Sequence, residues 1–385
     1  MKLVELGTIL HMDKGKKPQK QQEKYKEGYL PYVDIQAFEE GIIKSYADPQ
    51  KCLLCEDGDL LIVCDGSRSG LTGRAIKGVV GSTLSKISAD GLCTEYLQYF
   101  IQSKYTLLNT RKKGTGTPHL NAELLKKSKL VIPTQTEQER IVSKIEELFS
   151  KLDASVAELK TAKEKLKVYR QAVLKEAFAG EYPRISLKEI AKPLSGYAFK
   201  SKKYSINGKY VVVKIGNVKP FHFDFSRDFT KTIEVDDAIL SRYLLTRGDC
   251  LITMTGSRGK RDYGYVVMVE DQKNYLLNQR VAALRFNPSV ALPKFFEYYL
   301  SSPQYRNQFF SYETGNVGQG NVGIKALTEP EVICPPIKIQ EEIIQKIEFR
   351  LSLCDSIEQT IDTSLQQAEA LRQSILKQAF EGRLI

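Results

Sequence analysis

The sequence predicts an α+β protein in which two similar mixed α/β domains are separated by two long antiparallel helices that form a coiled coil. Two observations predict this fold: an internal repeat with a long period, and helical periodicity of the apolar residues within each copy. The expected order is a globular domain over residues 1–134, a long helix over 135–180, a second globular domain over 181–336 and a second long helix over 337–385. Such a repeat gives the chain an internal pseudo-two-fold symmetry.

The repeat is clearest in the two expected helices. The first copy starts with QERIVSKIEELFSKLD at Gln138 and finishes with RQAVLKEAFAG at Gly180. The second copy starts with QEEIIQKIEFRLSLCD at Gln340 and finishes with RQSILKQAFEG at Gly382. The offset is 202 residues at both ends, so the two copies align without a gap.

Both copies have the apolar spacing of a coiled-coil helix. Proline precedes each helix, at Pro133 and at Pro335 and Pro336, where its missing N–H does no harm, and Gly180 and Gly382 supply the usual C-terminal stop. The residues at heptad a and d positions are Ile141, Ile145, Leu148, Leu152, Leu159, Leu166, Tyr169 and Val173 in the first copy and Ile343, Ile347, Cys354, Ile357, Ile361, Ala368, Leu371 and Ile375 in the second.

Each helix would run for about 40 residues, or roughly 60 Å at the α-helical rise. A helix of that length with one apolar seam requires a partner. Because only residues 181–186 connect the first helix to the second globular domain, that domain must lie near the C-terminal end of the first helix. The second helix can then pair with the first only by running back along it, which predicts an antiparallel pair with one globular domain at each end.

The globular domains also repeat. GDLLIVCDGSRSG from Gly58 matches GDCLITMTGSRGK from Gly248, and CTEYLQYF from Cys93 resembles PKFFEYYL from Pro293. Short β-rich runs alternate with glycine-rich turns, and an aromatic helix is expected near Tyr96 or Phe296, so each domain should be mixed α/β or mainly β. The β-rich runs are 60–64, 210–215, 250–254 and 265–269.

The chain is basic, with 57 Lys and Arg against 46 Asp and Glu and a formal net charge of +11. A polyanionic partner would explain this excess, and a basic protein without such a partner is the alternative. The expected helices are nearly neutral, so the excess belongs to the loops of the globular domains. These basic loops are 14–26, 68–77, 111–113, 200–203 and 258–261.

Some of these loops carry the side chains that read base edges, since Arg, Lys, Asn and Gln can bond a base in the major groove and Thr can contact a thymine methyl. The alternatives are solvated surface charge and glycine-rich turns that only reverse the chain. The candidates for DNA binding are Arg68, Arg74, Lys77, Arg111, Lys112, Lys113, Thr115 and Thr117 in the first domain and Arg258, Lys260, Arg261, Asn278, Gln279, Arg280, Asn316, Gln319 and Asn321 in the second.

Motifs for chemistry are missing. The sequence has no methyltransferase motif of Asn or Asp, two prolines and an aromatic residue, and no phosphate-binding loop. Cys52 and Cys55 have zinc-like spacing without a second ligand pair, so buried strand cysteines are the stronger interpretation. Asp57, Asp59 and Asp65 lack the companion residues of a nuclease site and are interpreted as turn residues. We therefore expect no catalytic residue, no metal ligand and no bound cofactor.

Targeting signals are missing as well. The first ten residues lack the apolar run of a signal peptide, and no stretch approaches the roughly 18 apolar residues that span a bilayer. Seven cysteines in such a chain indicate reduced thiols rather than a disulfide framework. These features predict a cytoplasmic protein.

The pattern resembles the specificity subunits of type I restriction-modification systems over essentially the whole chain. The motifs that carry the resemblance are IPTQTEQERIVSKI from Ile132 and CPPIKIQEEIIQKI from Cys334, together with LKEAFAG and LKQAFEG at the helix ends. The resemblance implies two target-recognition domains that each read one half of a bipartite, asymmetric site in double-stranded DNA, with the helices as the spacer between them.

The resemblance also implies the partners. These are two methyltransferase subunits that use S-adenosylmethionine and, in restriction systems, motor-nuclease subunits that use ATP and Mg²⁺. The solvent-facing side chains of the helices would dock them, and ordinary solubilisation of a helix is the alternative. The candidates are Glu139, Lys144, Glu146, Arg170, Gln171, Lys175, Glu341, Lys346, Glu348, Arg372, Gln373 and Lys377.

Two other functions stay open. A coiled-coil adaptor that binds other proteins would show no salt-sensitive affinity for DNA. A nuclease with a degenerate metal site would cleave DNA in the presence of Mg²⁺.

Overall fold

A computed structural model describes residues 3–112, 118–205, 207–226, 231–232, 235–271, 273–316 and 318–384. The chain divides into two compact units. Unit 1 comprises Met1–Lys160 and Asp362–Ile385, and unit 2 comprises Thr161–Ile361. Both long helices cross this boundary, so each unit holds one globular domain and one stretch of each helix.

The two predicted long helices are confirmed as α5 (Gln135–Ala177) and α10 (Ile337–Phe380). A capping box begins α5: the Thr134 amide donates to Glu137 Oε2 at 2.8 Å, and the Glu137 amide donates to Thr134 Oγ1 at 3.4 Å. Gly382 follows α10 with a φ of 73°, the left-handed conformation that favours glycine after a helix.

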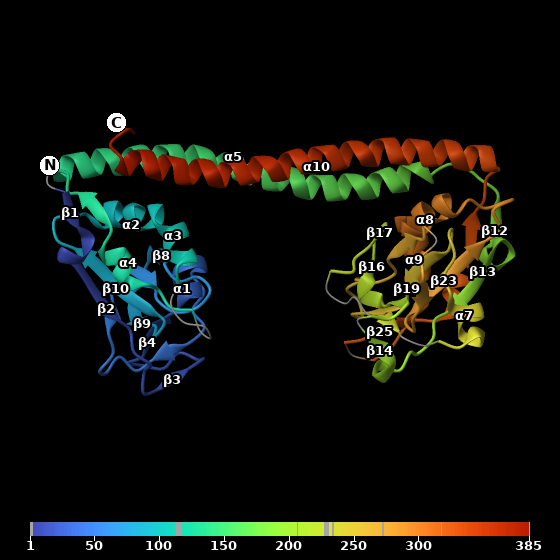
Figure 1. Ribbon diagram of the computed structural model, residues 1–385, viewed down its shortest axis with the longest axis horizontal. Coiled ribbons are helices and arrows are strands. Elements are labelled where there is room, and N and C mark those ends of the chain that lie inside the picture. Colours follow the sequence, from blue (N-terminus) through green and yellow to red (C-terminus); the bar gives the residue numbers. More distant parts are fainter. Residues whose placement is uncertain are drawn as a thin grey trace. The chain divides into compact units, whose positions relative to one another are not determined.

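Within each unit the helices pack side by side and antiparallel (Figure 1). In unit 1, Ile145 and Phe149 near the start of α5 pack with Ile375 and Leu376 near the end of α10. In unit 2 the start of α10 lies beside the end of α5, where Arg350 of α10 bonds Glu176 of α5. The predicted antiparallel pairing is therefore confirmed in both units.

Part of the heptad assignment was wrong. Tyr169, Ile357 and Leu371 were expected in the seam, but they are 41%, 42% and 50% exposed. A straight α-helix drifts by about 20° per heptad relative to an ideal seven-residue repeat, so a fixed register loses the seam over several turns.

The globular domain of unit 1 contains two main sheets. One is antiparallel with strand order β2–β10–β7–β8, and the other has the order β3–β5–β4–β9–β6 with β4 and β9 parallel. The strands are β1 (Leu3–Glu5), β2 (Leu10–Lys14), β3 (Gln21–Gln22), β4 (Leu30–Val33), β5 (Tyr46–Ala47), β6 (Leu54–Cys55), β7 (Leu60–Val63), β8 (Thr72–Arg74), β9 (Gly78–Val80), β10 (Leu84–Ala89) and β11 (Lys129–Val131). The helices are α1 (Ile35–Glu40), α2 (Thr94–Ser103), α3 (Tyr105–Thr110) and α4 (Ala122–Lys126).

The globular domain of unit 2 repeats this topology. Its antiparallel sheet has the order β13–β23–β19–β21, and β15 and β22 form the parallel pair. The strands are β12 (Arg184–Ser186), β13 (Ala191–Ser195), β14 (Tyr204–Ser205), β15 (Tyr210–Val213), β16 (Val218–Lys219), β17 (His222–Phe223), β18 (Lys231–Thr232), β19 (Cys250–Thr253), β20 (Thr255–Gly256), β21 (Val266–Met268), β22 (Tyr275–Leu277), β23 (Val281–Phe286), β24 (Glu313–Thr314), β25 (Gly320–Val322) and β26 (Glu331–Ile333). The helices are α6 (Leu187–Ile190), α7 (Asp237–Tyr243), α8 (Pro293–Ser301) and α9 (Pro303–Ser311).

An aromatic residue at the end of a long helix joins that helix to its globular domain. In unit 1, Phe380 makes edge contacts with Tyr96 and Phe100 of α2 at centroid distances of 5.1 and 5.3 Å. In unit 2, Phe178 contacts α8 through Phe295 and Tyr299 at 5.4 and 5.2 Å. Helix α2 thus lies between the helix pair and the sheet of unit 1, and α8 lies in the same place in unit 2 (Figure 1).

A buried glutamine makes a second connection. Gln138 Oε1 accepts from the Cys93 amide at 2.7 Å, and its Nε2 donates to the Gly91 carbonyl at 2.7 Å. Gln340 Oε1 accepts from the Leu292 amide at 2.8 Å in the same way. Cys93 therefore corresponds to Leu292, and the sequence alignment of Cys93 with Pro293 was wrong by one residue.

Candidate nucleic-acid interface

Three turns meet at one edge of the globular domain of unit 2. They are 256–261, 278–280 and the described residues 315–316 and 318–321, and we call them together the readout edge of unit 2. The Met254 amide donates to the Arg280 carbonyl at 2.9 Å, and the Val322 amide donates to the Met254 carbonyl at 2.9 Å. Residues 255–256 pair with 320–321 in antiparallel register. Backbone hydrogen bonds therefore hold the three turns next to one another.

The readout edge of unit 2 brings together all nine candidates of the second domain. Arg258 Nη1 donates to the Gly315 carbonyl at 2.6 Å, which ties the first turn to the third. Asn278 is buried and Asn321 is half-buried. The others are exposed: Arg258, Lys260, Arg261, Gln279, Arg280, Asn316 and Gln319.

Two arginines of this edge have strained backbones. Arg261 has a φ of 52° and Arg280 a φ of 69°, in the left-handed region that costs an L-residue free energy. Arg306 supports the first of them from α9, because its Nη2 donates to the Arg261 carbonyl at 2.9 Å and its Nη1 to the Gly264 carbonyl at 2.6 Å. Sequence reasoning missed Arg306, which has no motif around it.

Unit 1 has an equivalent readout edge, made of the described turns 66–68, 81–83, 111–112 and 118–121. The Cys64 amide donates to the Thr83 carbonyl at 2.8 Å, and the Leu120 amide donates to the Cys64 carbonyl at 2.7 Å. These bonds repeat those of Met254 in unit 2. Lys112 Nζ donates to the Ser67 carbonyl at 2.5 Å, which brings a further segment to the edge.

The candidates of the first domain divide into three groups. Arg68, Arg111 and Lys112 lie on the readout edge, and Arg68 forms an ion pair with Glu39. Arg74 and Lys77 do not lie there. The third group, Lys113, Thr115 and Thr117, lies outside the described residues.

Arg74 and Lys77 lie toward the other end of β7. Arg74 pairs with Leu60, the first residue of that strand, whereas the edge begins beyond its last residue. Arg74 Nη2 bonds Glu95 Oε1 at 2.8 Å, and Lys77 Nζ bonds Glu56 Oε2 at 3.0 Å. The structure therefore separates these two cations from the other candidates.

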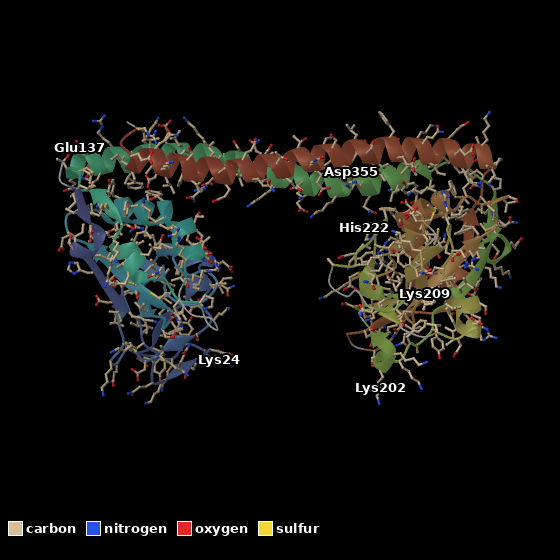
Figure 2. All side chains as sticks on the ribbon, in the orientation of Figure 1. Lys24, Glu137, Lys202, Lys209, His222 and Asp355 are labelled. Carbon is tan, nitrogen blue, oxygen red and sulfur yellow. The ribbon has the colours of Figure 1, made fainter. Side chains whose placement is uncertain are left out.

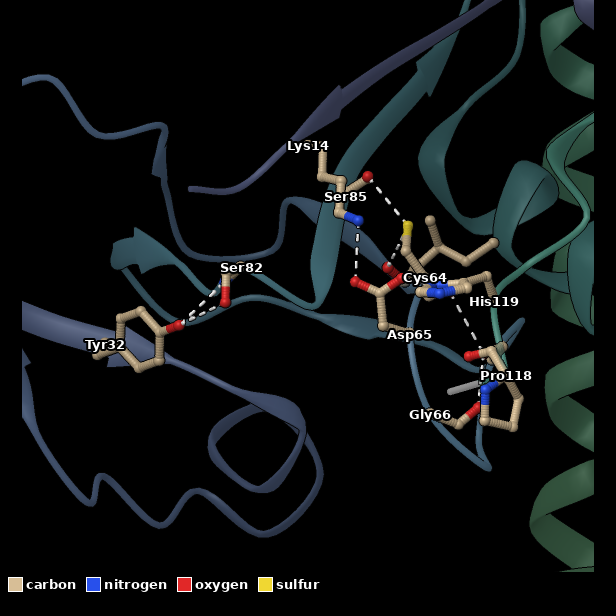
Figure 3. A network of polar contacts seen from close by, with 11 residues as sticks. Lys14, Tyr32, Cys64, Asp65, Gly66, Ser82, Ser85, Pro118 and His119 are labelled. Atoms are coloured by element: carbon tan, nitrogen blue, oxygen red, sulfur yellow. Dashed lines mark hydrogen bonds and ion pairs between the residues drawn. The ribbon is translucent and has the colours of Figure 1, made fainter. Parts of the chain in front are cut away.

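A polar network occupies the readout edge of unit 1 (Figure 3). Asp65 Oδ1 bonds His119 Nδ1 at 2.7 Å, and Asp65 Oδ2 accepts from Lys14 Nζ at 2.9 Å. Burial alone would raise the pKa of the Asp65 carboxyl, but the hydrogen bonds from Lys14 and His119 outweigh burial and hold the pKa below its usual value. Sequence analysis interpreted Asp65 as a turn residue and missed its partners.

Basic side chains also lie at the end of each globular domain that faces away from the helices. Figure 2 shows Lys24 there in unit 1 and Lys202 there in unit 2. Both belong to basic loops that the sequence singled out.

Two of the partner-binding candidates join the two helices. Arg170 Nη2 bonds Asp355 Oδ1 at 2.7 Å and Glu358 Oε2 at 2.9 Å. Arg372 pairs with Asp153, and its guanidinium lies 4.2 Å from the ring centroid of Phe149. These bonds explain why both arginines recur in the repeat.

The remaining partner-binding candidates are mostly on the helix surface. Lys144 and Gln373 are partly buried, and Lys144 Nζ bonds Glu147 at 2.8 Å. The exposed candidates are Glu139, Glu146, Gln171, Lys175, Glu341, Lys346, Glu348 and Lys377.

An exposed apolar stripe lies beside some of them on α10. It consists of Phe349, Leu353 and Ile357, which are spaced by four residues and so share one face of the helix. Phe349 is 73% exposed. The equivalent positions on α5, one repeat of 202 residues earlier, are Glu147, Lys151 and Ser155. Glu147 and Lys151 form an ion pair at 2.6 Å.

Two further features concern the described ranges: clusters of metal-ligating side chains and membrane-spanning helices. In that part of the chain, no group of three or more His, Cys, Asp or Glu side chains could hold a metal ion. No helix within the same ranges is long and apolar enough to cross a membrane. Cys55 is buried, and burial raises the pKa of its thiol to about 11.

Comparison with known proteins identifies the family. Residues 1–165 and 180–367 match the family described as type I restriction modification DNA specificity domain. The chain is 24% identical over 405 residues to the type I restriction enzyme MjaVIII specificity subunit of Methanocaldococcus jannaschii, which covers 99% of this chain and 92% of that protein. It is 22% identical over 358 residues to the EcoBI specificity subunit of Escherichia coli, which covers 85% of this chain and 73% of that one.

Solved structures have the same fold. The HsdS subunit from Thermoanaerobacter tengcongensis aligns with a TM-score of 0.54 and 18% identity over 99% of this chain and 97% of that one. A chain from a structure described as the basis of complex assembly and conformational transition of the type I R-M system aligns with a TM-score of 0.72 and 19% identity, covering 99% and 98%. Because the family match spans both globular domains and most of both helices, the chain belongs to the DNA specificity subunits of type I restriction-modification systems.

Proposed function

We propose that this chain reads DNA without catalysing a reaction itself, and that each globular domain reads one half of a bipartite, asymmetric site. The observation that carries the proposal is the readout edge, which occurs once in each unit. Each edge presents cations and amides on turns held by backbone hydrogen bonds, and these groups match phosphates and the edges of bases. Because the two edges differ in sequence, the two half-sites should differ as well.

The helices would dock two methyltransferase subunits. A surface suited to this has apolar area for a partner to cover and charged residues around it. The apolar stripe of α10 supplies the area, and exposed candidates such as Lys346 and Glu348 border it. S-adenosylmethionine would be bound by those partners, and ATP and Mg²⁺ by motor-nuclease subunits where these exist.

Co-expression with the methyltransferase subunit of the same system tests the function. We expect genome-wide mapping of methylated adenines to give a two-part motif with a fixed gap, which appears only when this chain is present. If the two proteins form no complex and no adenine is methylated, the adaptor function is favoured. Cleavage of DNA by the purified chain with Mg²⁺ would favour a nuclease.

A pair of variants tests the readout edge of unit 1. Arg68→Ala removes a cation from the edge, whereas Lys77→Ala removes one near the other end of β7. If Arg68 contacts a phosphate, its loss reduces the slope of log affinity against log salt by about one, and Lys77→Ala leaves the slope unchanged. Equal effects of the two variants would contradict the placement of the interface at this edge.

The helices would also set the gap between the half-sites. Deleting seven residues from the middle of α5, together with the seven that pair with them on α10, shortens each helix by about 10 Å. Since a base pair rises by about 3.4 Å, the gap in the methylated motif should shrink by about three base pairs. An unchanged gap would refute the role of the helices as a ruler.

A further inference from the structure

His119 stands out among the groups on the readout edge of unit 1, because a second residue fixes its orientation (Figure 3). The Asp65 carboxylate that bonds its Nδ1 is itself held by Lys14. The Asp65 side chain is 18% exposed, whereas the His119 side chain is 53% exposed. The less exposed member of the pair therefore positions the more exposed one.

The pairing also fixes which ring nitrogen of His119 carries the proton. An ionised carboxylate can only accept hydrogen bonds, so Nδ1 of His119 must be the donor to Asp65. In the neutral imidazole, Nε2 is then an acceptor. No hydrogen bond joins Nε2 to any residue within the described ranges, so this acceptor is free to meet a ligand.

Unit 2 has a different residue at the same place. Asp65 and His119 form a β-bridge, and the equivalent bridge in unit 2 joins Thr255 and Asn321. The Leu120 amide that follows His119 bonds Cys64, just as the Val322 amide that follows Asn321 bonds Met254. His119 and Asn321 thus occupy the same position of the two readout edges.

From this geometry we propose that His119 is a specificity-determining residue, whose Nε2 accepts a hydrogen bond from the exocyclic amine of an adenine or cytosine in the half-site read by unit 1. Asp65 and Lys14 are positioning residues. The inference rests on the proposed function and goes further by naming a base-contacting residue and the group that it reads.

The chemistry of Nε2 favours a base amine over the DNA backbone. Phosphate oxygens only accept hydrogen bonds, so a nitrogen that is itself an acceptor has no bond to make with them. In the major groove, adenine N6 and cytosine N4 are the donors. Asn321, which is equivalent to His119 in unit 2, offers both a donor and an acceptor and can bond an adenine at two atoms. His119 offers one acceptor.

Methylation mapping of variants co-expressed with the methyltransferase tests the proposal. We expect His119→Ala to relax the motif at one base pair of one half-site, with discrimination at that position reduced about tenfold or more. The other half-site should stay unchanged. Asn321→Ala should relax one position of the opposite half-site instead.

His11, a second histidine of unit 1, provides a matched control. His11 Nε2 bonds Asp90 Oδ1 at 3.0 Å, so it is also an exposed histidine paired with an aspartate. His11 lies on β2 and pairs with Ser88 of β10, toward the end of that strand remote from Leu84 and the readout edge. His11→Ala should therefore leave the motif unchanged.

Asp65→Asn separates the positioning role from the contact itself. An asparagine can donate to Nδ1 as well as accept from it, so the tautomer of His119 is no longer fixed. We expect the same base pair to be relaxed as in His119→Ala, but less strongly. A purely structural role for Asp65 would lower expression or thermal stability without singling out one base pair.

Several results would overturn the inference. A uniform loss of affinity across all sequences, with a shallower salt dependence, would show that a protonated His119 bonds a phosphate. An unchanged motif in His119→Ala would show that the residue makes no specific contact. If the wild-type chain directs no bipartite methylation, the proposed function itself fails, and that outcome is distinct from both.

Discussion

Gln340 provides a test of how each globular domain is attached to the helices. Its Oε1 accepts from the Leu292 amide at 2.8 Å, and its Nε2 donates to the Val290 and Pro335 carbonyls at 2.8 and 2.7 Å. The substitution Gln340→Leu keeps the approximate size of the side chain and removes these three bonds, together with a weaker contact of Nε2 with Cys334 Sγ at 3.9 Å. The start of α10 and the loop before α8 then lose the group that joins them.

The magnitude follows from the number of bonds. A buried hydrogen bond contributes about 1 kcal/mol net, so the loss of three should destabilise unit 2 by about 3 kcal/mol. In a unit of this size, each kcal/mol lowers the melting temperature by about 2–4 °C, which gives a decrease of roughly 6–12 °C. Gln138→Leu should have a similar effect on unit 1, because Gln138 makes the same three kinds of bond at 2.7, 2.7 and 3.1 Å.

Calorimetry and hydrogen exchange measure the two effects separately. The Leu292 amide should lose protection in Gln340→Leu, and the Cys93 amide should lose it in Gln138→Leu. Gln345→Leu is the matched control, since Gln345 is an exposed glutamine of the same helix. An unchanged melting temperature together with a protected Leu292 amide in Gln340→Leu would refute the reasoning.

Five other substitutions test separate features by direct measurement. Arg280→Gly should raise stability by up to about 1 kcal/mol in chemical denaturation because it relieves a positive φ, and should weaken DNA binding in the assembled complex. Phe178→Ala should cost about 3–5 kcal/mol and Phe380→Ala less, because Phe178 is buried and Phe380 is only partly buried. The Asp65→Asn variant should be less stable than the wild-type chain, and this difference in stability should narrow as the pH falls below about 4. A carboxyl whose pKa is lowered in the folded state stabilises the fold above its unfolded pKa and loses that effect as it is protonated. Phe349→Glu should abolish co-purification with the methyltransferase while the circular dichroism spectrum stays native.

The architecture could be predicted because it depends on repeated and periodic features of the sequence. The 202-residue repeat predicted both long helices, the short connector 181–186 predicted their antiparallel direction, and the GSR turns at Arg68 and Arg258 led to both readout edges. Such patterns depend on residue type and spacing alone. They can be recognised wherever several residues share the same type and spacing.

The missed features depend on single long-range contacts. His119 lies 54 residues from Asp65 in the chain, and Arg306 lies 45 residues from the Arg261 carbonyl that it supports. No local sequence pattern indicates such a pair. The alignment error of one residue at Cys93 has the same origin. An alignment based on apolar similarity allows a shift of one residue, whereas the hydrogen bond between the Cys93 amide and Gln138 fixes the position.

The two readout edges show how one scaffold could serve two half-sites. The bonds that hold the turns run from backbone to backbone, at Cys64 in unit 1 and at Met254 in unit 2. Because these backbone bonds need no side chain, side chains that tie no other turn, unlike those of Arg258 and Lys112, can change without loss of the fold. His119 in one unit and Asn321 in the other are such a change, so the two units can differ in what they read while they keep the same backbone.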